Sequence, residues 1–147
     1  MIYKYQPVIT EGPNGTDYRP TITDTTSENT LTELCTLDGY RYISVSDIVG
    51  ITVPEEITLE EVELTSELRE TIKATSPHTQ IIAQQVIDKI RAKYPLDEEL
   101  YFARIAVGAL QGTYDLLPGE LDAITQYQLD VEVAREWGRV ERAKLGL

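Results

Sequence analysis

The chain offers few side chains that perform chemistry near neutral pH. It contains one histidine, His78, and one cysteine, Cys35. Histidine is the residue whose ordinary pKa lies closest to neutrality, and cysteine is an effective nucleophile once deprotonated. A dyad would require Cys35, in a predicted strand, to meet His78 at a predicted helix start. Nothing in the spacing suggests this meeting, so an enzyme that uses either residue is the least favoured hypothesis.

Other arrangements that could support catalysis or metal binding are equally poor. Ser76 lies near His78, but it suits the N-cap of a helix that begins at Pro77, and no acidic residue is placed to orient the imidazole. One histidine and one cysteine cannot form the usual zinc site, and a single cysteine excludes an internal disulfide. Paired carboxylates such as Glu98 and Glu99 are common in an acidic chain and are not specific for glycoside hydrolysis. We predict no catalytic residue, no cofactor-binding residue, no metal ligand and no cofactor, and hence no enzyme.

The charge of the chain argues against two classes of partner. The formal net charge is −12, and residues 1–66 hold 3 of the 13 basic side chains but 12 of the 25 acidic ones. Binding to phosphate backbones or to anionic membranes depends on clustered Lys and Arg. No stretch approaches the roughly 18 apolar residues of a membrane span, and the first residues do not resemble a secretory signal. We therefore expect no nucleic-acid partner, no membrane partner, and synthesis in the cytoplasm.

The clearest structural pattern is a β-hairpin in the first third of the chain. Two β-prone runs between residues 30 and 45 flank Asp38-Gly39, a pair that readily adopts the positive φ angles of a two-residue turn. The resulting register places Leu37 opposite Tyr40, Cys35 opposite Tyr42, Leu34 opposite Ile43, and Thr32 opposite Val45. Both hairpin faces are then partly apolar, one with Leu31, Cys35, Leu37, Tyr40 and Tyr42, the other with Leu34, Ile43 and Val45. The second face needs a cover, from the N-terminal strand, the helices or another chain.

The second half of the chain has helical periodicity. Residues 66–74 form a first predicted helix, and Ser76-Pro77 begins a second that reaches Lys93. Asp97 is expected to cap a third helix that ends at Leu110 and is apolar on nearly every side except Arg104. We expect this helix, with Ile105, Val107 and Leu110, to be the most buried of the four. The last helix runs from residue 118 or 120 to residue 144 and has two adjacent apolar stripes.

These patterns predict an α+β fold. An N-terminal antiparallel β region with a hairpin, residues 1–50, is joined by a connector, residues 51–65, to a C-terminal bundle of about four helices, residues 66–147. A chain of 147 residues is long enough to bury one sizeable core.

The tyrosines are the best candidates for contact with a partner. The chain has nine Tyr against one Phe and one Trp, and tyrosine is favoured where a ring is half buried or meets another protein. We expect the β region to make the main contact with another chain, although core packing would also explain tyrosines in strands. A competing contact would use the basic end of the last helix, Arg139, Arg142 and Lys144, although these charges also complement the helix dipole. The candidate contact residues are Tyr3, Tyr5, Tyr18, Tyr40 and Tyr42.

The C-terminal half resembles small accessory proteins encoded among bacteriophage tail and fibre genes. The resemblance lies in Ser76-Pro77-His78 through Asp88-Lys89-Ile90-Arg91-Ala92-Lys93-Tyr94, in Leu96-Asp97-Glu98-Glu99-Leu100, and in residues 135–147. It implies a non-enzymatic structural protein of the phage tail, made in the host cytoplasm and present in the virion. Its partners would be other phage structural proteins, with the chain as a homo-oligomer or as part of a larger assembly. The alternative is an assembly chaperone or adaptor that is absent from the finished particle.

Overall fold

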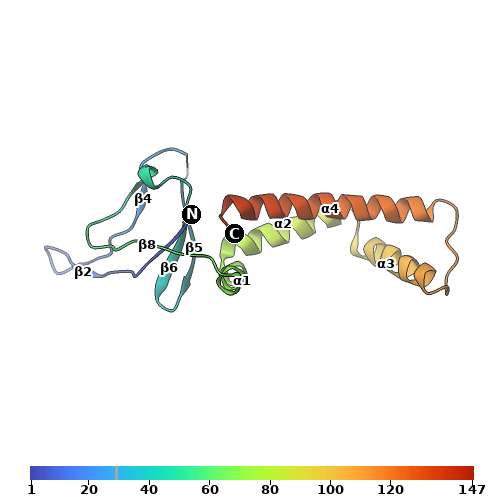
Figure 1. Ribbon diagram of the computed structural model, residues 1–147, viewed down its shortest axis with the longest axis horizontal. Coiled ribbons are helices and arrows are strands. Elements are labelled where there is room, and N and C mark those ends of the chain that lie inside the picture. The colour runs from blue at the N-terminus through green and yellow to red at the C-terminus, as the bar shows by residue number, and fades with distance from the viewer. Residues whose placement is uncertain (29) are drawn as a thin grey trace. The chain divides into compact units, whose positions relative to one another are not determined.

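The computed structural model describes residues 1–28 and 30–147 and has the expected α+β fold, with the strands in the first half and the long helices in the second (Figure 1). The chain divides into two compact units. The strand unit comprises residues 1–80 and 142–147, and the helical unit comprises residues 81–141. The division differs from the ranges 1–50, 51–65 and 66–147, because the first helix and the last six residues belong with the strands.

The strand unit is built on one four-stranded antiparallel sheet with the order β5-β6-β1-β8. Two further strand pairs, β2–β3 and β4–β7, are formed by the loops around it. The strands are β1 (Ile2–Tyr5), β2 (Thr10–Glu11), β3 (Asp17–Tyr18), β4 (Thr23–Asp24), β5 (Leu31–Leu37), β6 (Tyr40–Val45), β7 (Ile51–Thr52) and β8 (Glu60–Glu61), with a 3-10 turn over Ile48–Gly50.

The hairpin turns at Asp38-Gly39 as predicted, with φ angles of 49° and 80°. Leu37 pairs with Tyr40 and Cys35 with Tyr42, which confirms the register near the turn. The register then shifts between Glu33 and Cys35, so Glu33 pairs with Ile43 and Leu31 with Val45. The predicted pairs Leu34–Ile43 and Thr32–Val45 are therefore wrong, because a β-bulge places an extra residue in β5.

The bulge also changes which side chains share a face of the sheet. Leu34 and Cys35 are neighbours in sequence, yet both are buried in the same apolar cluster, and Leu31 packs with Ile43 and Val45. The predicted grouping of Leu31 with Cys35, and of Leu34 with Ile43, is wrong for this reason.

Both faces of the sheet are covered by the strand unit itself. On one face Ile43 and Val45 pack with residues from the loops and from β7, and on the other Leu34 and Cys35 pack with Ile72 of the first helix. Leu145 and Leu147, at the C-terminus, pack against the second cluster. The hairpin therefore needs no second chain to cover its apolar side chains.

The four predicted helices are present, as α1 (Ser66–Thr75), α2 (Pro77–Lys93), α3 (Leu96–Leu110) and α4 (Glu120–Lys144). Thr65 caps α1, where its hydroxyl accepts a hydrogen bond from the Leu68 N–H at 3.2 Å. The second helix begins at Pro77 as predicted, but the capping of α2 and α3 differs from expectation. The Ser76 hydroxyl is buried and has no hydrogen-bond partner among the described residues, while the Thr79 hydroxyl donates to the Ser76 carbonyl at 2.8 Å. Pro95, not Asp97, holds the N-cap position of α3, without a side-chain hydrogen bond.

The helical unit has a small aromatic core between α3 and α4. Tyr94, Phe102, Ile105 and Ile124 are buried together, and Tyr127 stacks on Phe102 with ring centroids 5.3 Å apart. The Tyr94 ring meets the Tyr127 ring edge to face at 5.0 Å. Within this unit α3 lies beside the N-terminal half of α4 and α2 beside its C-terminal half (Figure 1).

Candidate protein-contact surface

The third helix is buried on one face only, so the predicted burial is confirmed for Ile105 and wrong for Val107 and Leu110. Phe102 and Ile105 face the aromatic core, whereas the side chains of Val107 and Leu110 are 51% and 88% exposed. A helix that is apolar on nearly every side is normally covered by neighbours on every side. Within the described residues, α4 covers one side of α3, and the opposite side is exposed to solvent.

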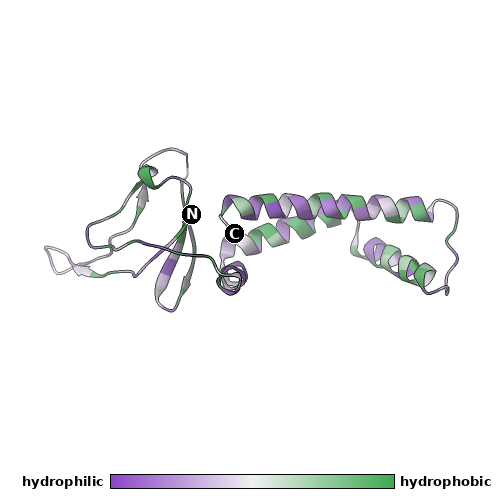
Figure 2. Cartoon of the chain, in the orientation of Figure 1, coloured by the Kyte–Doolittle hydropathy of each residue, from purple (hydrophilic) through white to green (hydrophobic). Residues whose placement is uncertain are grey.

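The exposed apolar residues of α3 form a continuous stripe, which we call the α3 seam. They follow one another at intervals of four, three, four and three residues, a spacing that keeps them on one face of a helix. Figure 2 shows how much of α3 is coloured as hydrophobic, whereas the colours of α4 alternate along its length. The members of the α3 seam are Leu96, Leu100, Ala103, Val107 and Leu110.

The size of the α3 seam sets it apart from scattered surface leucines. Leu96 and Leu100 are 51% and 54% exposed, in addition to Val107 and Leu110. Full burial of one such side chain contributes about 1.5–3 kcal/mol, so covering these four partly exposed residues would contribute on the order of 5 kcal/mol before the costs of association. Contiguous exposed apolar patches of this kind mark protein-interaction sites.

A groove runs along one side of the α3 seam. Its volume is about 730 Å³, and its lining includes Leu100, Arg104, Val107, Gly108 and Tyr114. The loop after α3 approaches the helix closely at Gly108, where an added Cβ would lie 2.8 Å from the Tyr114 Cβ. A residue with a side chain at position 108 would push this loop away from the helix.

The loop that forms the groove wall is fixed by the Glu120 carboxylate. The Tyr114 hydroxyl donates to both carboxylate oxygens, at 3.0 and 3.1 Å, and the Leu117 N–H donates at 2.7 Å. The Tyr101 hydroxyl of α3 donates to the same carboxylate. These bonds lower the pKa of Glu120, with the Tyr101 bond as the largest cause, and Glu120 raises the pKa of Tyr101 to about 12. The groove is therefore preformed near neutral pH.

Two charged side chains, Glu99 and Arg104, flank the α3 seam. Arg104 makes no ion pair or side-chain hydrogen bond with any residue that the structure describes. One carboxylate oxygen of Glu99 is buried and accepts no hydrogen bond within the described ranges 1–28 and 30–147. The Glu99 carboxylate lies near Tyr127 of α4, whose pKa is raised by burial and by this charge, whereas Arg104 is exposed and can reach a charged group on a partner.

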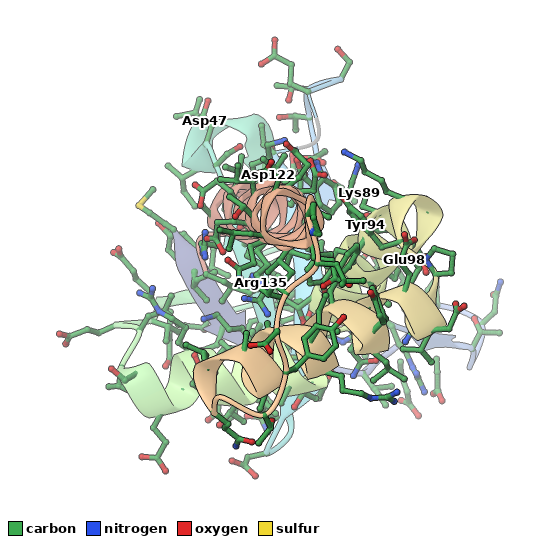
Figure 3. The ribbon with its side chains drawn as sticks, turned by 90° about the vertical axis from the view of Figure 1, so that its right-hand side faces the viewer. Asp47, Lys89, Tyr94, Glu98, Asp122 and Arg135 are labelled. Carbon is green, nitrogen blue, oxygen red and sulfur yellow. The ribbon has the colours of Figure 1, made fainter. Side chains whose placement is uncertain are left out.

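A smaller cavity of about 310 Å³ lies between α2 and α4, and its charged side chains contact one another or an aromatic ring. The Lys89 ammonium, labelled with Tyr94 in Figure 3, lies 4.5 Å from the centroid of the Trp137 ring. Lys93 and the Tyr94 hydroxyl both bind the Asp130 carboxylate at 2.5 Å, and these bonds lower the pKa of Asp130 to about 2. This group of side chains joins two helices, which accounts for its charges without a ligand.

The structure separates the five tyrosines of the predicted contact. Tyr5 is 4% exposed, in the core of the strand unit, so it is not available to a partner in this structure. Tyr3 packs against the same cluster as Tyr5, whereas Tyr42 packs against the cluster on the other face of the sheet. The Tyr40 ring lies beneath the Lys4 ammonium at 4.9 Å, and Tyr18, on β3, is 55% exposed. A contact through these tyrosines stays a prediction. The structure removes its original reason, because both faces of the hairpin are covered within the strand unit.

The other sequence candidates occupy different environments. Cys35 is buried, and desolvation raises the pKa of its thiol, whereas His78 is exposed at the start of α2. Arg139, at the basic end of α4, is held by Glu132 and Glu136 at 2.5 Å each. Among the described residues, no group of three or more His, Cys, Asp or Glu is arranged to hold a metal ion. No helix there is both long and apolar enough to cross a membrane.

The sequence pattern predicts the burial of Ile105 correctly but that of Val107 and Leu110 wrongly. The signal that identifies the α3 seam was present in the spacing of Leu96, Leu100, Ala103, Val107 and Leu110. It was hidden because Phe102, Ile105 and Ala106 between them are also apolar, which suggested burial all round. The chain matches no protein-family model, and no curated protein or solved structure shows significant similarity to it.

Proposed function

We propose that this protein is a non-enzymatic structural component that works through protein–protein contact, and that the α3 seam is its contact surface. The observation that carries this proposal is the row of exposed Leu and Val side chains on a helix whose opposite face is buried. The preformed groove beside the row supports it, because a surface that is rigid before binding loses little conformational entropy on association.

The larger assembly that we propose is a bacteriophage tail. This part of the proposal rests on the resemblance of residues 76–100 and 135–147 to accessory proteins encoded among tail and fibre genes. The virion would be the final location, with other phage structural proteins as partners. The second candidate is an assembly chaperone or adaptor, for which an exposed apolar helix face is equally suitable.

Mass spectrometry of purified particles tests the proposal. Phage would be produced in a host that supplies either the wild-type chain or a variant with Leu100→Ser, Val107→Ser and Leu110→Ser. We expect the wild-type chain in the particles, and at least tenfold less of the seam variant per particle. The matched control is Val49→Ser, which changes an 84% exposed valine of the strand unit and should leave the amount unchanged.

Two outcomes would contradict the proposal in different ways. The wild-type chain could be absent from the particles although tail assembly requires it. That result would favour the assembly chaperone. Equal incorporation of the seam variant and the wild-type chain would show that the α3 seam is not the contact surface. Circular dichroism of each purified variant confirms that it has folded.

A further inference from the structure

We infer that the α3 seam binds the α3 helix of a second copy of this chain, with the two helices parallel and in register. This inference rests on the proposed function, since it names the partner of the same surface. It is carried by three features of the described residues: the spacing of the seam, the two charged side chains that flank it, and the groove along one side.

The spacing of the α3 seam is that of a coiled coil. In a heptad repeat the contact positions a and d alternate at intervals of three and four residues. Leu100 and Val107 then occupy a positions, while Leu96, Ala103 and Leu110 occupy d positions. A β-branched residue at a with leucine at d favours two strands, and Val107 with Leu96 and Leu110 follows this pattern, whereas Leu100 does not. The small Ala103 side chain leaves room for two helices to approach closely. The outer face of α3 therefore presents two heptads to a partner helix.

The two charged side chains that flank the α3 seam fit a parallel second copy. In this repeat Glu99 occupies a g position and Arg104 the next e position, five residues later. In a parallel pair of helices a g residue lies beside the following e residue of the partner, so Glu99 of each chain meets Arg104 of the other. The two-fold axis makes this ion pair twice. The guanidinium of Arg104, which has no ion-pair partner among the described residues, acquires one, and Glu99 supplies it through its second carboxylate oxygen, since the first is buried against its own chain.

An antiparallel pair satisfies only one of these charges. In that arrangement e positions face e positions and g positions face g positions. With the leucines aligned, Arg104 would meet Asp97 of the second copy, but Glu99 would lie beside Ala106. The parallel pair is therefore the better match to the charges of α3.

The groove supplies room for the partner helix. It follows the side of α3 that carries Leu100, Arg104, Val107 and Gly108, and its far wall is Tyr114. The α3 helix is already folded against the aromatic core, so pairing does not have to fix its backbone. Two heptads bury less area than a standard interface, so we expect a dissociation constant on the order of 10 µM.

Sedimentation equilibrium of the full chain tests the inference. We expect a dimer at 100 µM that dissociates on dilution to 1 µM. Glu99→Arg and Arg104→Glu should each weaken dimerisation at least tenfold, because like charges then meet twice. An equimolar mixture of these two variants should restore a dimer, since each chain then presents the charge that the other needs. The matched control is Glu98→Arg, which makes the same charge change one residue away, at a position off the seam, and should dimerise like the wild type.

Cross-linking reports the orientation of the helices. In a Cys35→Ser background, Leu110→Cys should give a disulfide-linked dimer on oxidation with copper phenanthroline, because equivalent d positions are adjacent in a parallel pair. The control is Val49→Cys, which is similarly exposed in the strand unit and should remain monomeric.

Three results would overturn the inference. These are a wild-type chain that is monomeric at 100 µM, a dimer that tolerates Glu99→Arg, and a dimer in which the Leu110→Cys variant does not cross-link. The proposed function is tested separately by the particle measurement. If the chain is monomeric but enters particles through the α3 seam, this inference alone is refuted. If the chain dimerises but its seam variants enter particles normally, the proposed function alone is refuted.

Discussion

Replacing Ile105 with alanine should destabilise the helical unit far more than replacing Leu110, although both residues lie on one helix. Ile105 is 4% exposed and packs among Phe102 and Ile124. Its truncation removes three buried carbon atoms, worth about 0.8 kcal/mol each, and leaves a cavity, so we expect a loss of about 3 kcal/mol. Leu110 is 88% exposed, so the same calculation gives about 0.3 kcal/mol. Differences in helix propensity change either value by less than about 0.5 kcal/mol.

Urea denaturation followed by Trp137 fluorescence measures this difference. Trp137 is the single tryptophan of the chain and belongs to α4, so its emission reports the helical unit. The measurement should be made at about 1 µM, where a dimer through the α3 seam would be dissociated and its mass-action contribution would be absent. An m-value that is the same for both variants and the wild type would show that neither change alters the compactness of the unfolded state.

Equal losses for the two variants would refute the reasoning. They would mean that Leu110 is buried in solution, as the sequence pattern first indicated, and that α3 has no exposed seam. A loss below about 1 kcal/mol for Ile105→Ala would show instead that the aromatic core does not determine the stability of the helical unit.

Two further predictions concern the turn of the hairpin and the contact between α2 and α4. Gly39→Ala should cost about 1–2 kcal/mol, measured by far-UV circular dichroism in urea, because the φ angle of 80° is unfavourable for a residue with a Cβ; an unchanged midpoint would contradict this. The pKa of Asp130 is lowered from an ordinary 3.8 to about 2 by Lys93 and Tyr94, so its carboxylate stabilises the fold above pH 4 and loses this effect as the pH falls towards 2. Asp130→Asn should therefore be less stable than wild type at pH 6 by Trp137 fluorescence, with the difference shrinking towards pH 2; a gap that is constant with pH would refute the assignment.

Local features of the chain were predictable because they depend on neighbours in sequence. Asp38-Gly39 determines the hairpin turn through its own φ angles, and Ser76-Pro77 marks the start of α2 through the missing N–H of proline. The four helices and the α+β class follow from the same short-range periodicity. None of these features requires knowledge of what lies across the fold.

Features that depend on distant segments were decided only by the tertiary structure. The bulge in β5 lets Leu34 and Cys35 both enter the cluster formed with Ile72, a residue almost forty positions away. Ser76 has the sequence of an N-cap, yet its hydroxyl is buried without a partner because α1 and α2 meet there with almost no intervening loop.

The candidate contact surface illustrates the same limit. The residues of α3 are apolar nearly all round, so the sequence alone does not determine which face meets the core. The packing of Phe102 and Ile105 against Ile124 of α4 makes that choice, and it leaves Leu100, Val107 and Leu110 on the outside. Apolar spacing determined that α3 forms a helix, and the position of α4 determined which of its side chains another protein can reach.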